Sequence, residues 1–378
     1  MVFTLRYGMV GGGEGAFIGD VHRKAAAFDR LAEITAGCFS RDAAKSATTG
    51  QKLGISSDRI YTNYEEMAEK ESKREDGIHF VSIVTPNSSH YDIAKTFLLH
   101  GIHVVCDKPL TVEESEAREL ERISKERGLL FCVTYTYSGY PMVKQAREMV
   151  RQGKLGDIYM VMAEYPQEWI LHADASAWRM DPAVGGKSCC VGDIGVHIAH
   201  TVSYVTGLKI ASLCANLNTY GREMKLDNNA SIMVKYTNGA SGVYWCSQVA
   251  TGYNNGLKIR IFGTGGSLEW EQETPDVLRY APLGQPVQML SRGRDPLYPA
   301  AAKFSRIPGG HPEGVYEAFA NIYKAFSLEL IGKLNGTGGE ETADYPRIEE
   351  GIEGVRFVDK CLESAQNGSQ WVAFDTAK

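Results

Sequence analysis

The stretch Gly8-Met9-Val10-Gly11-Gly12-Gly13-Glu14-Gly15-Ala16-Phe17-Ile18-Gly19 decides the fold of the N-terminal part of this chain. It joins an apolar run to a helical segment that carries His22. Glycines between a first strand and a first helix let backbone N–H groups approach a pyrophosphate, and the helix N-terminus favours its charge. The spacing is not a regular GxGxxG, since Ala16 stands where the third glycine is expected and Gly19 follows three residues later. We predict a dinucleotide site with Gly11, Gly13, Ala16, Phe17 and Ile18 as contacts, and a plain tight turn is the alternative.

Strand-like and helix-like segments alternate from this stretch to about residue 134. The apolar runs are residues 5–10, 32–39, 78–85, 102–106 and 129–134, and the helical segments are 22–28, 43–53, 64–75, 90–100 and 113–127. Strands that alternate with helices are typical of a parallel, doubly wound sheet. The sequence therefore predicts an α/β domain over residues 1–134.

The end of the second strand does not decide between NAD and NADP. A carboxylate at this point would bind the ribose 2′-hydroxyl of NAD, whereas a basic residue would accommodate the 2′-phosphate of NADP. Ser40 and Arg41 could cradle a phosphate, or Arg41 could stack on the adenine while Asp42 points elsewhere. Ser40 and Arg41 are candidate contacts for NAD(H) or NADP(H), with NAD(H) slightly favoured.

Polar clusters follow the next two strands. One is Thr85-Pro86-Asn87 with His90, and the other is Asp107-Lys108 before Pro109. In open α/β sheets, ligands lie beyond the carboxyl ends of the strands, so we expect both clusters to lie near the nicotinamide ribose. The ammonium group of Lys108 can polarise a substrate oxygen or bind a ribose, although a lone lysine before a turn is more often a surface residue.

From residue 135 onward, two-residue periodicity dominates. The strand-like segments are residues 158–165, 210–218, 230–236, 240–248, 257–262 and 267–271, and apolar stripes at helical spacing run along 315–330 and 348–362. Asn238-Gly239 is a strong hairpin signal, and residues 274–310 are expected to form a long loop region. The sequence predicts a second, α+β domain over residues 135–378, built on a large, mostly antiparallel open sheet.

Asp193 and His197 are four residues apart in a glycine-rich segment. If Asp193 begins a helix, both side chains lie on one face, where a carboxylate can hold one tautomer of an imidazole and raise its basicity. That pair suits a general base for a hydroxyl proton. The plainer reading is a helix N-cap aspartate followed by a half-buried histidine. The neighbouring Cys189-Cys190 has no further ligand spacing around it, so no metal site is predicted.

Composition excludes several classes of partner. The formal charge of −6, with 43% hydrophobic and 23% charged residues, is typical of a globular protein and argues against nucleic acid or an anionic membrane surface. The eight cysteines contain no CxxC pair, and neither a signal-peptide pattern nor an apolar run of membrane-spanning length is present. We expect a cytoplasmic protein that binds a small molecule.

An ordered set of motifs resembles the glucose–fructose oxidoreductase / inositol dehydrogenase (Gfo/Idh/MocA) family along essentially the whole chain. The motifs are Gly19-x-x-His22, Thr85-Pro86-Asn87-x-x-His90, Asp107-Lys108-Pro109-Leu110, Gly192-Asp193-Ile194-Gly195-Val196-His197, His311-Pro312-Glu313-Gly314 and Gly368-x-x-Trp371-Val372. The resemblance implies a nicotinamide cofactor in an N-terminal Rossmann domain and a substrate on the face of an open C-terminal sheet. Asp107 stands where relatives commonly have Glu, and the lengthened glycine loop is a second departure.

The resemblance also implies a catalytic set, which maps onto Lys108, Asp193 and His197. His197 would take the proton of a substrate hydroxyl, Lys108 would stabilise the developing alkoxide, and Asp193 would orient the base. Relatives place polar contact residues where this chain has Tyr137. Further candidates to line a sugar are Trp178, Arg179 and His311.

The function expected from this set is an NAD(P)-dependent dehydrogenase. It would oxidise a secondary hydroxyl of a sugar, inositol or glycoside, including oxidation at C3 of a hexose, by hydride transfer to nicotinamide. The alternatives are an NAD-dependent glycosidase of the same fold that uses transient sugar oxidation, and a non-catalytic dinucleotide sensor. An uncovered sheet face further predicts a homodimer or homotetramer.

Overall fold

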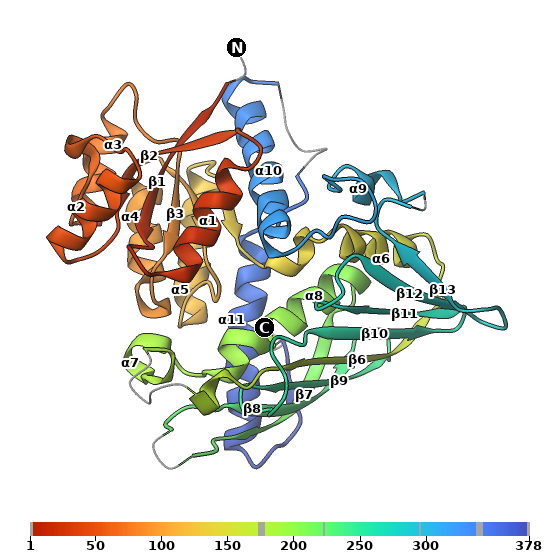
Figure 1. Cartoon of the computed structure of the whole chain (residues 1–378). Coiled ribbons are helices and arrows are strands. Elements are labelled where there is room, and N and C mark those ends of the chain that lie inside the picture. The colour runs from red at the N-terminus through yellow and green to blue at the C-terminus, as the bar shows by residue number, and fades with distance from the viewer. Residues whose placement is uncertain (1–2, 173–177, 222–223, 295, 338–342, 376–378) are drawn as a thin grey trace. The chain divides into compact units, whose positions relative to one another are not determined.

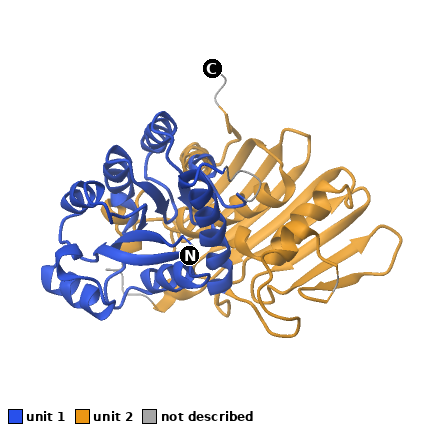
Figure 2. Ribbon diagram, turned by 90° about the horizontal axis from the view of Figure 1, so that it is seen from above, with its two compact units in different colours: residues 1–136, 315–352 blue, residues 137–314, 353–378 orange. Residues whose placement is uncertain are grey.

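The computed structural model describes residues 3–172, 178–221, 224–294, 296–337 and 343–375. The chain divides into two compact units (Figure 2). The first contains Met1–Thr136 and Val315–Ile352, and the second contains Tyr137–Gly314 and Glu353–Lys378. This division differs from the sequence-based boundary in one respect, because the segment 315–352 joins the N-terminal unit. Among the described residues, no helix is both long enough and apolar enough to cross a membrane.

A five-stranded parallel sheet in the order β2-β1-β3-β4-β5 forms the centre of the first unit. Its strands are β1 (Leu5–Gly11), β2 (Ala32–Cys38), β3 (Phe80–Val84), β4 (His103–Cys106) and β5 (Phe131–Val133). Every residue of β3, β4 and β5 is buried, as expected for a parallel sheet with both faces covered. The predicted doubly wound sheet is confirmed.

Helices cover both faces of this sheet. They are α1 (Phe17–Ala27), α2 (Ala43–Lys52), α3 (Tyr64–Ser72), α4 (His90–Leu99) and α5 (Glu114–Glu126), with short 3₁₀ turns at Ser57–Arg59 and Asn87–Ser89. Figure 1 shows α1 beside α10 (Val315–Leu334) on one side of the sheet and α4 with α5 on the other. Phe319, Tyr323 and Phe326 of α10 are buried, and the ring of Phe326 contacts that of Phe80 at 5.2 Å. This burial explains why the segment after residue 314 belongs to the first unit.

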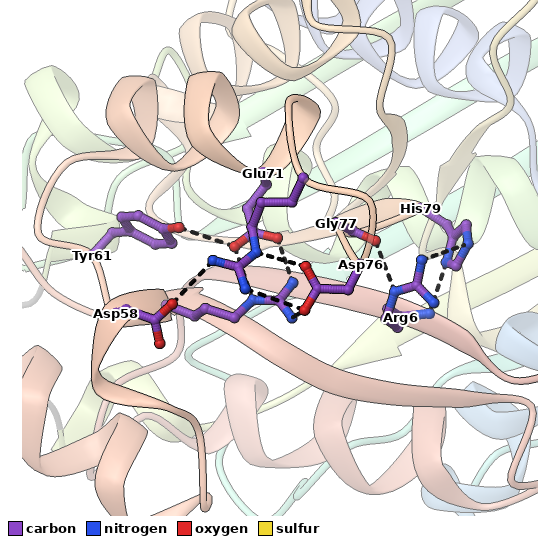
Figure 3. Close-up of polar contacts among 9 residues, drawn as sticks. Arg6, Asp58, Tyr61, Glu71, Asp76, Gly77 and His79 are labelled. Carbon is purple, nitrogen blue, oxygen red and sulfur yellow. Dashed lines mark hydrogen bonds and ion pairs between the residues drawn. The ribbon is translucent and has the colours of Figure 1, made fainter.

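Two sets of polar contacts hold the segments that flank β1, β2 and β3 (Figure 3). Arg59 forms a two-pronged ion pair with the buried Glu71 of α3, and the hydroxyl of Tyr61 donates to the same carboxylate at 3.0 Å. Arg6 of β1 donates through Nε to the Gly77 carbonyl oxygen at 2.9 Å, and its backbone N–H donates to His79 Nδ1 at 2.9 Å. The Arg6 contacts lie at the amino ends of β1 and β3. Because ligands of such folds bind at the opposite, carboxyl ends, we assign these contacts to stability.

A nine-stranded sheet in the order β13-β12-β11-β10-β6-β9-β8-β7-β14 forms the second unit. Its strands are β6 (Ile158–Pro166), β7 (Ile210–Asn218), β8 (Asn229–Tyr236), β9 (Ser241–Ser247), β10 (Lys258–Gly263), β11 (Gly266–Glu271), β12 (Val277–Pro282), β13 (Gln288–Ser291) and β14 (Val372–Ala373). All neighbours run antiparallel except β6 and β9. The predicted open sheet is confirmed, but the expected long loop at 274–310 is wrong, because it contains β12, β13 and the short helix α9 (Pro299–Ala302).

Helices cover one face of the second sheet. They are α6 (Pro141–Arg151), α8 (Val196–Thr206) and the greater part of α11 (Ile348–Gln366). The short helix α7 (Pro182–Gly185) and the 3₁₀ turns at Trp169–His172 and Trp178–Met180 belong to the connection between β6 and α8. Along β8, Ile232 and Val234 are buried whereas Met233 and Lys235 are exposed. This alternation leaves the other sheet face open.

Candidate active site

The loop after β1 takes a conformation that requires its glycines. Gly11 and Gly12 have φ angles of +85° and +68°, a region that L side chains rarely adopt. A Cβ atom on Gly19 would lie 2.4 Å from Gly12 Cα. Gly19, and not Ala16, therefore provides the close strand–helix packing of a third fingerprint glycine. The three extra residues of the loop hid this role from the sequence pattern.

The beginning of α1 suits a pyrophosphate. The helix begins at Phe17 after Ala16, whose side chain provides no cap for the first-turn N–H groups. Such groups, together with the helix dipole, favour a bound anion. A hydrogen bond holds the glycine-rich loop next to α2: the Glu14 backbone N–H donates to Oγ1 of Thr49, a residue of α2, at 3.1 Å. The predicted contacts Gly11, Gly13, Ala16, Phe17 and Ile18 thus belong to a loop and helix start that fit a dinucleotide.

The tip of β2 carries one acidic and one basic side chain with different surroundings. Asp42 Oδ1 accepts from the Lys45 backbone N–H at 3.0 Å, so the carboxylate caps α2. The Asp42 backbone N–H donates to Ser40 Oγ at 3.1 Å, and Arg41 is exposed. The carboxylate at the end of β2 is therefore used within the protein, as the cap of α2.

His90 connects the ends of β3 and β4. It is buried, with Nδ1 2.9 Å from the Pro109 carbonyl oxygen and Nε2 2.9 Å from that of Thr85. Both ring nitrogens face backbone carbonyls, so the side chain holds the two loops together, and its predicted contact with the cofactor stays a prediction. Pro86 is exposed and Asn87 half-buried beside this connection.

Asp107 fixes the backbone beside Lys108. Its Oδ1 accepts from the Lys108 backbone N–H at 2.9 Å and from Thr134 Oγ1 at 2.8 Å. The carboxylate of Asp107 therefore accepts hydrogen bonds from within the protein and holds the loop. The short side chain of Asp, where relatives commonly have Glu, is able to make both bonds. The Lys108 residue is half-buried.

The predicted helix start at Asp193 has a different local geometry. A π-helical turn spans Val191–Gly195, and α8 begins only at Val196. The backbone N–H groups of Cys189 and Val191 donate to the carboxylate of the buried Asp227 at 3.1 and 2.9 Å. The Ser188 hydroxyl donates to the same carboxylate at 3.0 Å. Asp227 thus anchors the start of the turn, and the Val196 N–H closes it by donating to the Val191 carbonyl oxygen, so Asp193 precedes the α-helix that carries His197.

A hydrogen bond and an ion pair hold the carboxylate of Asp193. Gln248 Nε2 donates to Oδ2 at 2.9 Å, and Arg179 Nε lies 3.7 Å from Oδ1. The Arg179 guanidinium also lies over the ring of the neighbouring Trp178, at 4.4 Å from its centroid. The structure thus brings the predicted residues Trp178, Arg179 and Asp193 together, all half-buried.

The imidazole of His197 packs against a buried tyrosine. The Tyr137 ring meets it edge-on with centroids 4.9 Å apart. The Tyr137 hydroxyl is directed elsewhere, to the Tyr165 hydroxyl and to Gln272 Oε1. Burial raises the pKa of Tyr137 well above its usual value, so the phenol stays protonated. Tyr137 therefore supports the ring of His197. Because its hydroxyl is used within the protein, the predicted contact with substrate would be made by the ring of Tyr137.

His311 contributes its backbone to a buried ion cluster. Arg292, whose side chain is fully buried, pairs with Asp276 at 2.7 Å and Glu313 at 2.9 Å, and it donates to the His311 carbonyl oxygen. The His311 side chain is exposed. The His-Pro-Glu-Gly motif is thus explained by Glu313 as a structural residue, and a substrate contact by His311 stays a prediction.

Comparison with known proteins identifies the relatives of this chain. Residues 5–135 match the model of an oxidoreductase family with an NAD-binding Rossmann fold, and residues 143–269 match the GFO/IDH/MocA C-terminal domain. An uncharacterised oxidoreductase of Bacillus subtilis is 38% identical over 98% of this chain and 97% of its own. The chain belongs to the Gfo/Idh/MocA family. Its N-terminal unit is accordingly an NAD-binding Rossmann domain, and the protein is an oxidoreductase.

Solved members of the Gfo/Idh/MocA family agree with this assignment. An oxidoreductase from Sinorhizobium meliloti is 41% identical, with a TM-score of 0.89, and the match covers 98% of this chain and 99% of the other. An inositol dehydrogenase homologue from Azotobacter vinelandii, complexed with NAD+, is 36% identical with a TM-score of 0.94, covering 99% and 98%. The same homologue is known with NADH and myo-inositol, at a TM-score of 0.93. Both predicted domain folds of the family are confirmed.

Sequence reasoning missed four residues around this candidate site. Gly19 was identified only as a late glycine, whereas Asp227, Gln248 and Tyr165 carry no motif signal at all. Each of the last three acts through a partner at least 28 positions away in the chain. Patterns among neighbouring residues in the sequence do not indicate partners that are so far away in the chain.

Proposed function

We propose that this protein is a nicotinamide-dependent dehydrogenase that oxidises a secondary hydroxyl of an inositol, sugar or glycoside. The observation that carries the proposal is the Asp193–His197 segment. Its carboxylate accepts a hydrogen bond from Gln248, pairs with Arg179 at 3.7 Å, and lies in the turn that leads into the helix of the buried His197. Support comes from the homologue solved with NADH and myo-inositol, which is similar to this chain over nearly its whole length.

The proposed catalytic set is Lys108, Asp193 and His197. His197 takes the proton of the substrate hydroxyl, a step for which a positioned base contributes roughly 10²–10⁴-fold. Lys108 stabilises the charge that develops on the same oxygen. Asp193 is the anionic partner that orients and tunes His197. A bound nicotinamide supplies the hydride acceptor. In this proposal Trp178, Arg179, Tyr137 and His311 line the substrate.

The choice of cofactor is part of the proposal, and we favour NAD(H). The two Azotobacter vinelandii complexes with NAD+ and NADH support it. Ser40 and Arg41 are the residues that would accept a 2′-phosphate. Comparing kcat/KM for NAD and NADP in wild type and in Arg41→Ala tests the choice, because only NADP turnover depends on a cation beside the 2′-position.

A homodimer or homotetramer formed through the open sheet face is the proposed assembly. Met162, Val243 and Met233 are cross-strand neighbours on β6, β9 and β8, and they give this face an apolar centre. Val243 and Met233 are 39% and 48% exposed. Light scattering of wild type and Val243→Lys tests the assembly, since a charge at this point should lower the mass. A cytoplasmic location stays a prediction from the sequence.

The decisive experiment is an assay of the purified protein with NAD and a panel of inositols, hexoses and glycosides. Stoichiometric formation of NADH supports the dehydrogenase. Release of aglycone without net reduction would identify a glycosidase instead, and cofactor binding without turnover of any polyol would identify a sensor.

A further inference from the structure

A buried glutamine connects the candidate catalytic carboxylate to the adjacent turn. Gln248 directly follows β9 and is completely buried. Its Nε2 donates to Asp193 Oδ2 at 2.9 Å, and its Oε1 accepts from Cys189 Sγ at 3.2 Å. The amide therefore spans two points of one segment, four residues apart.

The contacts of the amide determine which end faces Asp193. An ionised carboxylate only accepts hydrogen bonds, whereas a thiol can donate one. With Cys189 donating to the oxygen end, the nitrogen end is presented to Asp193. The backbone of Gln248 is held as well, since its N–H donates to the Asn228 carbonyl oxygen at 2.8 Å and its carbonyl oxygen accepts from the Ile170 N–H at 3.2 Å.

The turn that contains Cys189 and Val191 is also held by hydrogen bonds. Asp227, immediately before Asn228, holds the N–H groups of Cys189 and Val191. Cys189 also packs in a small apolar cluster with Ile170 and Met180. Asp227 precedes β8 and Gln248 follows β9, so the residues that contact this segment lie at the same end of two paired strands.

We propose that Gln248 is a positioning residue for Asp193, and that the Cys189 thiol sets the orientation of its amide. The inference rests on the proposed function, in which Asp193 tunes His197. Loss of one hydrogen bond to a charged group should lower kcat by about 10- to 100-fold. Binding of NADH should change little, because neither Gln248 nor Cys189 belongs to the Rossmann unit.

The test compares four variants of the full chain. Gln248→Leu removes both bonds, Cys189→Ala removes only the thiol donor, and Cys189→Ser keeps a donor. Gln145→Leu is the matched control, since Gln145 is also buried but accepts from the backbone N–H of Tyr298 at 2.9 Å. We expect kcat to fall most in Gln248→Leu, less in Cys189→Ala, and within about threefold of wild type in Cys189→Ser and Gln145→Leu. NADH affinity, measured by fluorescence, should stay unchanged in all four.

Wild-type kcat in a folded Gln248→Leu protein would overturn the inference. If that variant does not fold, equal kcat values for Cys189→Ala, Cys189→Ser and wild type would overturn it. If the wild type oxidises no polyol, the proposed function fails separately. The crystal structure of Gln248→Leu then decides the inference, because an Asp193 carboxylate in its original orientation would contradict it.

Discussion

Nδ1 of His90 lies 2.9 Å from the carbonyl oxygen of Pro109, the residue directly after Lys108. The other ring nitrogen lies 2.9 Å from the Thr85 carbonyl oxygen, so one buried imidazole connects the polar segments that follow β3 and β4. In a doubly wound sheet these segments border the ligand. The position of the Lys108 backbone therefore depends on a residue of α4.

Replacing His90 by Leu should loosen this connection without emptying the space it fills. A neutral imidazole has one N–H, so the variant loses at least one buried hydrogen bond, worth about 1 kcal/mol, and we expect kcat/KM for the cofactor to fall about tenfold. Steady-state kinetics with varied NAD measure the effect. His100→Leu is the control, because His100 is an exposed histidine at the end of the same helix. Equal kinetics in the two variants would show that the connection does not position the site.

Lys108→Ala and His197→Ala should each lower turnover by about 100-fold or more, because each removes a group proposed to act on the reacting oxygen. Cofactor should still bind, which a fluorescence titration with NADH checks. Near-normal turnover in both variants would exclude the proposed catalytic set.

Glu313→Ala should destabilise the second unit strongly. It leaves the fully buried Arg292 with Asp276 as its remaining carboxylate partner, and breaking a buried pair on one side costs about 3–5 kcal/mol. Denaturant unfolding measures the change. His311→Ala is the matched variant, since it keeps the backbone carbonyl that Arg292 uses and removes an exposed side chain. Its stability should stay within about 0.5 kcal/mol of wild type, and a rise in its KM for substrate would support the predicted substrate contact.

Acid should destabilise the protein through its buried histidines. Burial lowers the pKa of His200 to about 3, and those of His22 and His103 to about 4. The unfolded chain, with a histidine pKa near 6.5, binds these protons first, so stability falls as pH drops below about 6.5. For His200 alone, the loss between pH 7 and pH 5 is about 2 kcal/mol.

The slope of stability against pH tests this account. His200→Leu should flatten the change in unfolding free energy between pH 7 and pH 5, whatever its effect at pH 7. Gln145→Leu, which replaces a buried side chain that does not titrate, should keep the wild-type slope. An unaltered slope in His200→Leu would contradict a buried, neutral His200.

Elements with a clean repeating pattern were predicted well from the sequence. The strands β1 to β5 and the helices between them follow from apolar runs, helix periodicity and glycine positions, which are local properties. β12 and β13 were missed because most of their residues are only partly buried, so neither strand shows a clear alternation. The apolar stripe along residues 315–330 was predicted to be helical and to face the core, but the sequence could not indicate which sheet that stripe contacts.

The sequence by itself determined the fold class of both domains, the family, and Lys108, Asp193 and His197 as the candidate catalytic residues. Tertiary structure alone decided how Asp193 and its turn are held. Gln248 is 55 positions from Asp193 in the chain, and Asp227 is 36–39 positions from the residues of the turn that it contacts. The physical reason is that periodicity and motif spacing report contacts within a few turns of the chain. A hydrogen bond between distant segments exists only after the sheet has brought them together.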